Sequence, residues 1–342
     1  MRKRKELFRS LCLVLCLSLT MGVLAGCSWF SGNEQATPAP EGSQTPGEAE
    51  AADVKKPALP EKLTMKDGTP WVQVYVVADE KVEDMDIETY VQGVLAGEMR
   101  NDWPMEALKA QAILARTFVL KFIAEKNSRY DGADISTDIT EAQAYDASSV
   151  NDRIKQAVEE TRGQVLSYEG ELPYAWFHAH AGGKTELSQA GLEFKGEEPG
   201  YTQIVESPDS DKAPTSVKNW TATFTKDELV EAARQAGVSV KNADSVELGD
   251  RTESGRVIQI IIDGQPVSAP ALRIQLDGKK LKSTMIEDVS ISGDEVTFSG
   301  SGYGHGVGMS QWGAYAMAEE GKSADQIVQH YFKNVDIVSL WT

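Results

Sequence analysis

The segment that most constrains the fold is a pair of predicted helices, residues 86–99 and 104–125. Apolar residues recur in the first helix at spacings of three and four: Ile87, Val91, Val94 and Leu95. This period predicts one buried face, and Glu98 continues it because Glu98 lies seven residues after Val91. A carboxylate in apolar surroundings has its charged form disfavoured and its pKa raised. Such a carboxylate can donate a proton near neutral pH.

The second helix carries two cations, Lys109 and Arg116, which lie two turns apart and therefore on one face. The usual interpretation of such residues is a solvated charged face. The surrounding Ala, Ile and Leu residues leave this helix little exposed surface, which favours cations aimed at a substrate, where they stabilise developing oxyanions. They would also lower the pKa of Glu98, in opposition to its burial.

The first 26 residues predict a secretory signal peptide. A basic start at residues 2–5 precedes a short apolar run at 11–19 and the small residues before Cys27, unlike a membrane-spanning helix. The Leu-Ala-Gly-Cys ending resembles the bacterial lipobox, so Cys27 is the expected lipidation site. The alternative is an ordinary signal peptide cut near Ala25. Cys12 and Cys16 would leave with the signal, so the mature chain would have neither disulfides nor Cys-ligated metal.

The mature chain would be strongly acidic. The chain has 34 Lys and Arg and 52 Asp and Glu, of which residues 1–26 hold five and one, giving a net charge of about −22 after cleavage. Nucleic-acid binding relies on Lys and Arg at phosphates, so no nucleic-acid partner is expected. The expected location is the outer face of the cell membrane in a Gram-positive-type bacterium, through the lipid anchor.

Composition divides the chain into three parts. Residues 27–60 are rich in Pro, Ala, Gly, Glu and Ser and predict a disordered tether, and residues 61–342 form the folded part. Strands are predicted at 71–77, 163–168, 174–180, 256–263 and 289–292, and further helices at 225–237, 310–320 and 324–333. Because helices and strands do not alternate strictly, the fold class is α+β. We expect helices and antiparallel strands to form a substrate groove in one core domain, with a smaller subdomain inserted at about 195–295.

A Gly-rich stretch, residues 301–313, has Gly at every second position from 302 to 308. Glycines permit positive φ and close approach of a backbone or ligand. No nucleotide site is expected, because the Gly-Lys-Ser/Thr and GxGxxG patterns are absent. Two interpretations of the loop and its His305 remain open: a tight bend packed on the core, or the lining of a groove.

His178 and His180 would point to the same face of a strand, a spacing compatible with a metal. Only His305 and His330 remain as further imidazoles, and no HExxH motif is present. The adjacent Gly-Gly pair is more simply a turn. No metal or other cofactor is therefore expected.

Together these motifs resemble the SpoIID/LytB family. The resemblance rests on Glu98-Met, Trp-Pro at 103–104, residues 106–117, Phe177 with Gly-Gly-Lys-Thr at 182–185, and the stretch Gly-Tyr-Gly-His-Gly-Val-Gly-Met-Ser-Gln-Trp-Gly-Ala at 302–314. It spans most of residues 65–342. This chain departs from the pattern in two ways. Some relatives bind zinc through Cys and His, whereas the mature chain would have no suitable Cys. Other relatives span the membrane, whereas this chain resembles a lipid-anchored protein.

The resemblance implies a lytic transglycosylase that acts on peptidoglycan glycan strands stripped of stem peptides, with a role in cell-wall remodelling and sporulation engulfment. It implies that Glu98 is the catalytic acid and that Lys109 and Arg116 matter for activity. It also implies a functional Tyr and a following acidic residue, matched here by Tyr201 and Asp209. Of the remaining candidates, Gln143 and Tyr145 belong to a predicted groove wall at residues 135–145. His305 and Gln311 come from the Gly-rich motif.

A glycosidic hydrolase usually needs two carboxylates, whereas this sequence offers one well-placed carboxylate. That suits a reaction in which the sugar's own hydroxyl attacks. Glu98 would protonate the bond between N-acetylmuramic acid and N-acetylglucosamine and then deprotonate the muramic C6 hydroxyl, giving a 1,6-anhydro end.

Two other classes stay open. In the first alternative, the protein binds glycan without cleaving it and enhances the activity of a cell-wall amidase. Its partners would be that amidase or other engulfment proteins. A lesser alternative is a zinc hydrolase built on His178, His180 and His305.

Overall fold

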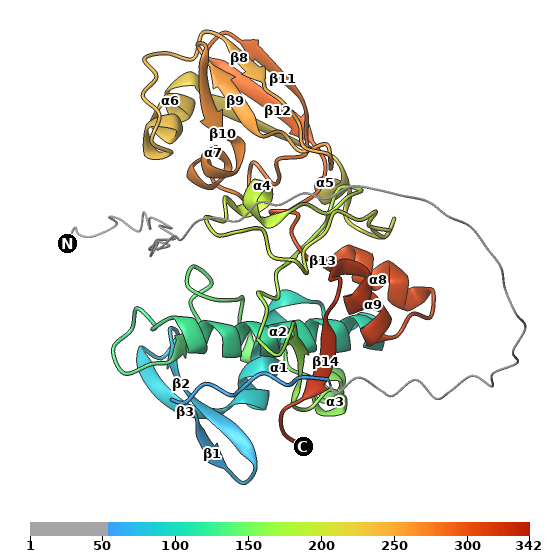
Figure 1. Ribbon diagram of the computed structural model, residues 1–342. Helices are drawn as coiled ribbons and strands as arrows, with labels where there is room; N and C mark the ends of the chain where they lie inside the picture. Colours follow the sequence, from blue (N-terminus) through green and yellow to red (C-terminus); the bar gives the residue numbers. More distant parts are fainter. Residues whose placement is uncertain (1–53) are drawn as a thin grey trace, which may run out of the picture. The chain divides into compact units, whose positions relative to one another are not determined.

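The structure is a computed structural model that describes residues 54–342 (Figure 1). The predicted signal peptide, Cys27 and the predicted tether up to residue 53 lie outside the described residues. Residues 55–60, which their composition assigned to the tether, lie against the folded core. The Ser167 hydroxyl donates to the Lys55 carbonyl at 2.7 Å, and Pro57 and Pro60 are buried.

Three antiparallel strands open the folded part: β1 (Thr64–Lys66), β2 (Thr69–Val76) and β3 (Lys81–Asp86). A short strand, β4 (Ile135–Ser136), pairs in parallel with β2. Along β2, the fully buried Val72 and Val74 alternate with the exposed Gln73, so one face of this sheet packs on the helices.

The two predicted helices are present as α1 (Ile87–Glu98) and α2 (Met105–Glu125). The Asp86 carboxylate caps α1 by accepting the Thr89 N–H at 3.0 Å. All four residues of the predicted apolar face of α1 have no exposed surface, which confirms that face. Helix α2 begins after Pro104 and is buried along most of its length.

The other elements outside the second core lie within residues 137–219 and 309–342. They are η1 (Ala147–Ser149), α3 (Asp152–Glu160), β5 (Gln164–Ser167), β6 (Phe177–His178), α4 (Ser188–Leu192), α5 (Thr215–Lys218), β13 (Met309–Ser310), α8 (Gln311–Glu319), α9 (Ala324–Tyr331) and β14 (Asp336–Ser339). Strand β14 pairs antiparallel with β5, and β13 pairs in parallel with β6. The C-terminal segment is thereby joined to strands that precede it by more than a hundred residues.

A second hydrophobic core is built from residues 220–298. Its elements are β7 (Trp220–Thr225), α6 (Lys226–Gln235), β8 (Val246–Leu248), β9 (Gln259–Ile262), β10 (Gln265–Ser268), α7 (Ala269–Gln275), β11 (Ile286–Ser292) and β12 (Glu295–Gly300). The strands form two antiparallel sheets, in the orders β10-β9-β8 and β11-β12-β7. Phe224, Ile260 and Phe298 are among its buried residues.

The mixture of helices with mainly antiparallel strands confirms the α+β fold class. Two of these helices begin with capping boxes, α6 at Thr225 with Glu228 and α9 at Ser323 with Gln326. No helix within residues 54–342 is both long enough and apolar enough to cross a membrane.

The strand predicted at 174–180 is reduced to the two residues of β6. The aromatic residues that suggested a strand instead stack on one another: the rings of Tyr174 and Trp176 lie 4.9 Å apart. The Tyr174 N–H donates to the Tyr201 hydroxyl at 2.8 Å rather than to a strand. Aromatic packing therefore replaces a ladder of backbone hydrogen bonds in this segment.

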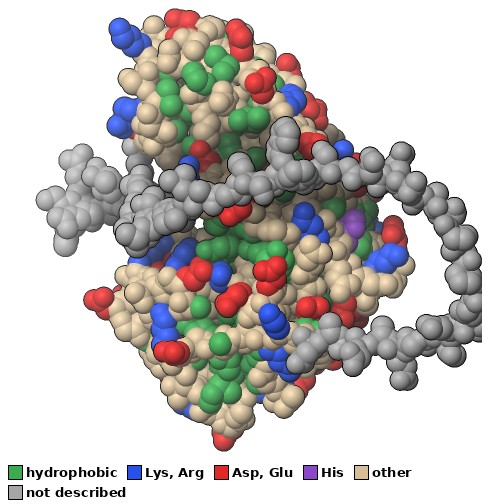
Figure 2. All heavy atoms as spheres, viewed as in Figure 1, with side chains coloured by type: hydrophobic (Ala, Val, Ile, Leu, Met, Phe, Trp, Pro, Cys, Tyr) green, Lys and Arg blue, Asp and Glu red, His purple; other side chains and the backbone are tan. Residues whose placement is uncertain are grey.

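On the face drawn in Figure 2, acidic and basic side chains are interspersed. This distribution differs from the one-sided basic surface of nucleic-acid-binding domains.

Candidate active site

Glu98 lies in a pocket of about 690 Å³. Segments from distant parts of the chain line it: the end of α1, residues 142–144, residues 175–179, α7, the Gly-rich loop and the start of α8. Its polar side chains are Glu98, Gln143, His178, Arg273, Tyr303, His305 and Gln311. Among the described residues that line this pocket, Glu98 is the only carboxylate.

Two neutral donors hold the Glu98 carboxylate. One oxygen accepts the Ala144 N–H at 2.7 Å, and the other accepts the Gln311 side-chain amide at 3.3 Å. Burial raises the pKa of Glu98, and these two hydrogen bonds oppose the increase without cancelling it. The sequence left open whether burial or neighbouring cations would prevail, and in the structure burial prevails.

The Ala144 backbone reaches Glu98 because α1 has glycines on the side that faces this loop. A Cβ on Gly97 would lie 2.7 Å from the Tyr145 nitrogen, and one on Gly93 would lie 2.2 Å from the Tyr145 ring. Glycine at both positions lets residues 144–145 pack directly on the helix. The Tyr145 ring also stacks on Tyr90, with centroids 5.7 Å apart. Tyr145 thus supports the loop, and its neighbour Gln143 lines the pocket with its side-chain oxygen unpaired.

The Gly-rich loop both packs on the core and lines the pocket. Gly302, Gly304, Gly306 and Gly308 all have positive φ. A Cβ on Gly308 would lie 2.0 Å from the Trp176 carbonyl oxygen, so close backbone packing requires glycine there. The same loop brings Tyr303 and His305 to the pocket. The packing interpretation left open by the sequence is therefore confirmed, and the loop also lines this pocket.

The two imidazoles of the pocket are neutral. Burial is the main cause that lowers the pKa of His305 to about 3, and the nearby Arg273 and Arg256 add to it. Burial likewise holds the pKa of His178 well below its usual value. The His178 and His305 rings lie 5.7 Å apart, and His178 Nδ1 is 3.1 Å from the Val307 carbonyl oxygen. Because a carbonyl oxygen only accepts, this contact places the His178 proton on Nδ1.

His180 does not join His178 in the pocket. Its Nδ1 lies 3.2 Å from the Asp209 carboxylate instead. Within residues 54–342, no group of three or more His, Cys, Asp or Glu side chains is placed to hold a metal ion.

The pocket also contains a cation, Arg273, that was not predicted from the sequence. Arg273 lies on α7. Its Nε donates to the Lys282 carbonyl at 2.9 Å, and its Nη2 donates to the Gly278 carbonyl at 3.3 Å. Those contacts hold its guanidinium against the pocket wall. Arg273 lies 175 residues from Glu98 in the chain, and only the folding of the second core brings it near.

Lys109 and Arg116 do not reach the pocket, contrary to the sequence interpretation. Lys109 pairs with Glu106 at 2.9 Å and with Glu160. Arg116 has no exposed surface and pairs with Glu88, Nη2 to Oε2, at 2.6 Å. Carboxylates of α1, α2 and α3 therefore pair with both cations, and neither cation is among the causes that shift the pKa of Glu98.

Tyr201 and Asp209 also have structural contacts. Tyr201 is buried, and its ring lies edge-on to Tyr168 with centroids 5.1 Å apart. Asp209 accepts the Gly182 N–H at 3.0 Å and the Ser310 hydroxyl at 2.5 Å, so it fixes the Gly-Gly turn to the start of α8. The predicted site residues that the structure brings together are thus Glu98, Gln143, His305 and Gln311.

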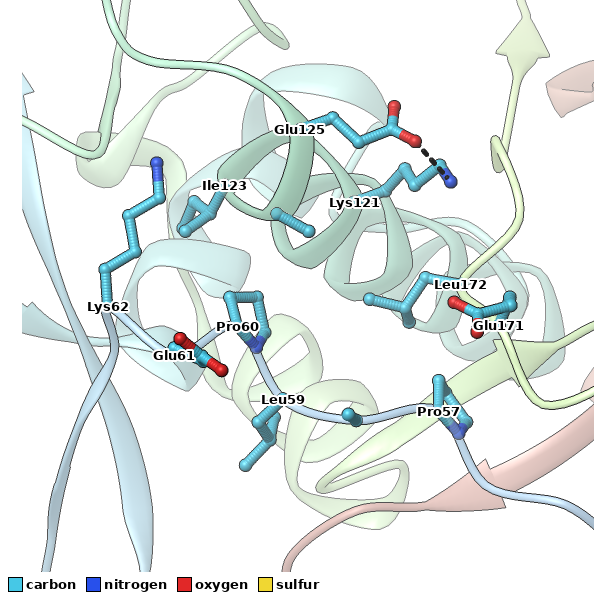
Figure 3. A pocket seen from close by; sticks show the side chains of 12 residues that line it. Pro57, Leu59, Pro60, Glu61, Lys62, Lys121, Ile123, Glu125, Glu171 and Leu172 are labelled. Carbon is cyan, nitrogen blue, oxygen red and sulfur yellow. Dashed lines mark ion pairs between the residues drawn. The ribbon is translucent and has the colours of Figure 1, made fainter.

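A separate cavity of about 740 Å³ lies between residues 57–62 and the end of α2 (Figure 3). Its charged groups include the ion pair of Lys121 with Glu125, at 2.7 Å. Lys62 is turned to the Lys126 carbonyl, to which it donates at 2.8 Å. This cavity has none of the buried carboxylate and neutral imidazole chemistry of the Glu98 pocket.

Fold and site together define an α+β protein with one carboxylate of raised pKa among the described residues of a pocket that also contains two imidazoles and an arginine. Residues 78–168 match the sequence profile of the family described as SpoIID, stage II sporulation protein, and residues 175–308 match a domain of unknown function, DUF8618. The chain belongs to the stage II sporulation protein D family, as its motifs predicted.

Three relatives illustrate the match. Stage II sporulation protein D of Bacillus amyloliquefaciens is 34% identical over 288 residues, which cover 80% of each chain. Stage II sporulation protein D of Bacillus subtilis (strain 168) is 31% identical over 341 residues, 96% of this chain and 93% of the relative. The amidase enhancer of the same organism is 30% identical over 296 residues, 73% of this chain but 40% of the relative.

Proposed function

We propose that this protein is a lytic transglycosylase that cleaves the β-1,4 bond between N-acetylmuramic acid and N-acetylglucosamine in peptidoglycan glycan strands. The observation that carries the proposal is Glu98: a carboxylate whose burial raises its pKa, in a pocket where no other carboxylate is found among the described lining residues. A protonated carboxyl group is the general acid that departure of a glycosidic oxygen requires.

A two-carboxylate hydrolase is less well supported. The nearest further carboxylate in the adjoining cavities is Asp102, which is exposed and paired with Arg100 at 2.7 Å. That hydrogen bond lowers the pKa of Asp102. Retaining and inverting glycosidases place both carboxyl groups on either side of the scissile bond. The Glu98 pocket offers no such partner, which favours attack by the sugar's own hydroxyl.

The reaction then needs one group that acts twice. The Glu98 carboxylic acid gives its proton to the glycosidic oxygen, and the bond from that oxygen to the muramic C1 breaks. The resulting Glu98 carboxylate takes the proton of the muramic C6 hydroxyl, and that oxygen bonds to C1 to close the 1,6-anhydro ring. Glu98 ends as it began, and no water is consumed. Arg273 and Tyr303 supply donors for substrate oxygens.

The adjoining cavities suit a polymeric substrate. A cavity of about 460 Å³ shares Gly97 and Glu98 with the catalytic pocket, and a third, of about 200 Å³, shares Arg100 and Asp102 with the second. Glu98 would therefore sit within a series of sites, as cleavage inside a glycan strand requires.

Product analysis tests the proposal. Purified protein is incubated with glycan strands from which an amidase has removed the stem peptides, and the products are examined by mass spectrometry. We expect ends of 1,6-anhydro-N-acetylmuramic acid, which are lighter by one water than hydrolytic ends. Reducing ends would indicate a hydrolase, and intact strands would overturn the proposal of cleavage.

A second candidate function is supported by one relative, the amidase enhancer. In that case the same cavities would bind glycan without cleaving it and would raise the activity of a cell-wall amidase. Glycan strands that remain intact, together with a faster amidase reaction in the presence of this protein, would favour this function.

The pH dependence of cleavage is expected to respond to Gln311. Its hydrogen bond stabilises the charged form of Glu98 and so lowers the pKa. Gln311→Ala should therefore raise the pKa of Glu98 and move the alkaline limb of the kcat/KM profile to higher pH. The acid must be protonated in the free enzyme, so activity is lost as pH rises through that pKa. A limb that stays in place, or moves to lower pH, would show that Glu98 is not the group that titrates.

We also propose that Cys27 anchors the protein to the outer face of the membrane. The support is the sequence of residues 1–27 alone. In a host that processes lipoproteins, the wild-type protein should incorporate labelled fatty acid and pellet with membranes. Cys27→Ala should remove the label and release the protein to the soluble fraction. A labelled Cys27→Ala protein would rule out anchoring through this residue.

A further inference from the structure

Three aromatic rings form a cluster beside residues of the Glu98 pocket in the sequence, since Trp103 follows Glu98 by five residues and Trp312 directly follows Gln311. The centroids of Trp103 and Trp312 lie 4.5 Å apart, those of Trp103 and Tyr315 5.2 Å, and those of Trp312 and Tyr315 5.3 Å. Trp103 is buried, but Trp312 and Tyr315 are each partly exposed. They lie three residues apart on α8, hence on one face of that helix.

The backbone around these rings is fixed by hydrogen bonds. The Trp312 N–H donates to the Ala179 carbonyl at 3.0 Å, and the Trp312 carbonyl accepts the Ser210 N–H at 3.2 Å. Arg153 donates to the Trp103 carbonyl at 2.6 Å. Rings held in this way lose little conformational freedom when a ligand settles on them.

The rings line the cavity of about 200 Å³ described above, whose lining residues are Arg100, Asp102, Trp103, Lys212, Trp312 and Tyr315. Pockets for drug-sized ligands measure roughly 300–1,000 Å³, so this cavity suits a single ring. The cavity of about 460 Å³ shares lining residues with this cavity on one side and with the catalytic pocket on the other. A ligand that occupies it and Glu98 together must therefore be an extended chain.

Two cations lie at the rim of this cavity. Arg100 pairs with Asp102 at 2.7 Å, and Lys212 pairs with Glu319 and approaches the Tyr315 hydroxyl at 3.3 Å. The Arg100 and Lys212 side chains are 72% and 61% exposed, so both can turn to a ligand anion at little cost. The cavity thus combines aromatic faces with two exposed ion pairs, whose cations can turn to a ligand anion.

We propose that Trp103, Trp312 and Tyr315 form a distal saccharide subsite for a glycan strand whose reacting bond lies at Glu98. The subsite takes an N-acetylmuramic acid ring whose lactyl carboxylate is free. The apolar C–H face of the sugar packs on the Trp312 and Tyr315 rings, where dispersion and burial favour it. Its carboxylate meets Arg100 and Lys212. This inference rests on the proposed glycan substrate but not on cleavage.

A binding experiment tests the subsite. Full-length protein in detergent, carrying Glu98→Gln so that the ligand is not consumed, is titrated with short and long fragments of denuded glycan by isothermal calorimetry. The titrations are then repeated with a protein that carries both Glu98→Gln and Tyr315→Ala. We expect the affinity advantage of long over short fragments to fall about three- to tenfold, the factor expected from loss of one aromatic contact. The matched control is Trp71→Ala, an aromatic residue on β2 outside these cavities, which should keep the full advantage.

The charge requirement has its own comparison. Arg100→Gln together with Lys212→Gln should weaken the binding of long denuded fragments but not that of neutral N-acetylglucosamine oligomers of equal length. An equal loss for both ligands would overturn the assignment of the lactyl carboxylate. An unchanged ratio of long to short affinity in Tyr315→Ala, with unfolding as in the parent, would overturn the subsite itself. Neither result depends on cleavage: intact strands with a lost length advantage would leave the subsite standing and refute only the transglycosylase proposal.

Discussion

Glu98→Gln is expected to reduce glycan cleavage by about 10²–10⁴-fold, the contribution typical of a positioned general acid and base. The amide has nearly the same shape as the carboxylic acid but can neither protonate the glycosidic oxygen nor accept the C6 hydroxyl proton. Its oxygen can still accept the Ala144 N–H, and the Gln311 amide can turn to present its own oxygen. The substitution therefore removes the chemistry and keeps the contacts. The measurement is the rate at which anhydro ends appear.

The same variant should fold normally. Burial raises the pKa of Glu98 in the native state above its unfolded value, so the native state binds the proton more tightly. Stability from this group is complete below the unfolded pKa and is lost as pH rises through the native pKa. Above that pH, Gln at position 98 avoids a buried charge. The free energy of unfolding of Glu98→Gln should therefore be at least as large as that of the wild type.

A matched control separates a lost acid from a lost negative charge. Glu106→Gln changes a partly buried carboxylate that pairs with Lys109 and accepts the Ala324 N–H at 2.8 Å, outside the catalytic pocket. Its cleavage rate should stay close to that of the wild type. Equal losses in Glu106→Gln and Glu98→Gln, or substantial activity in Glu98→Gln, would contradict the assigned role of Glu98.

The position of Glu98 could be predicted because helical periodicity is local information. The spacing from Val91 and Val94 placed the carboxylate at the edge of the buried face, and burial proved to govern its pKa. The partners of Glu98 could not be predicted in the same way. Ala144 and Gln311 lie 46 and 213 residues away in the chain, and no local pattern encodes contacts at that separation.

Arg273 shows the same limit more strongly. It lies on a short helix of the second core and makes its nearest contacts with carbonyls of its own segment. Nothing in residues 269–275 distinguishes it from a solvated arginine. Only the packing of the second core places it against the pocket that contains Glu98 and His305.

The buried position of Arg116 had a signal in the sequence. Glu88 lies three residues before Val91 and seven before Leu95, so it also falls on the buried face of α1. A buried acid on one helix beside a buried cation on the next predicts a pair between them rather than a substrate contact. In the structure, Glu88 has 3% exposure and Arg116 has none.

The pair of Glu88 and Arg116 joins several parts of the core. The Glu88 carboxylate also accepts the Gly163 N–H at 3.1 Å and the Trp341 indole N–H at 2.9 Å. Arg116 donates to the Gln164 carbonyl at 2.9 Å. The pair therefore connects α1 and α2 to the start of β5 and to the C-terminal end of the chain. A buried pair with its remaining hydrogen bonds satisfied can persist without water.

Arg116→Ala is expected to lower the free energy of unfolding by about 3–5 kcal/mol, the cost of leaving a buried charge without its partner. Glu88 would keep only two neutral donors, and the space of the lost guanidinium would remain as a cavity. Lys109→Ala, seven residues earlier on the same helix, is the matched control. Lys109 is 20% exposed and its partners are more exposed, so its loss should cost about 1 kcal/mol or less. Urea denaturation of the wild type, Arg116→Ala and Lys109→Ala measures both values.

Replacing both members of the buried pair, with Arg116→Met and Glu88→Gln, should recover part of the lost stability, because no unpaired charge is then left behind. If Lys109→Ala proved the more destabilising change, or if Arg116→Ala kept full stability and lost only cleavage, Arg116 would have to act on the substrate after all.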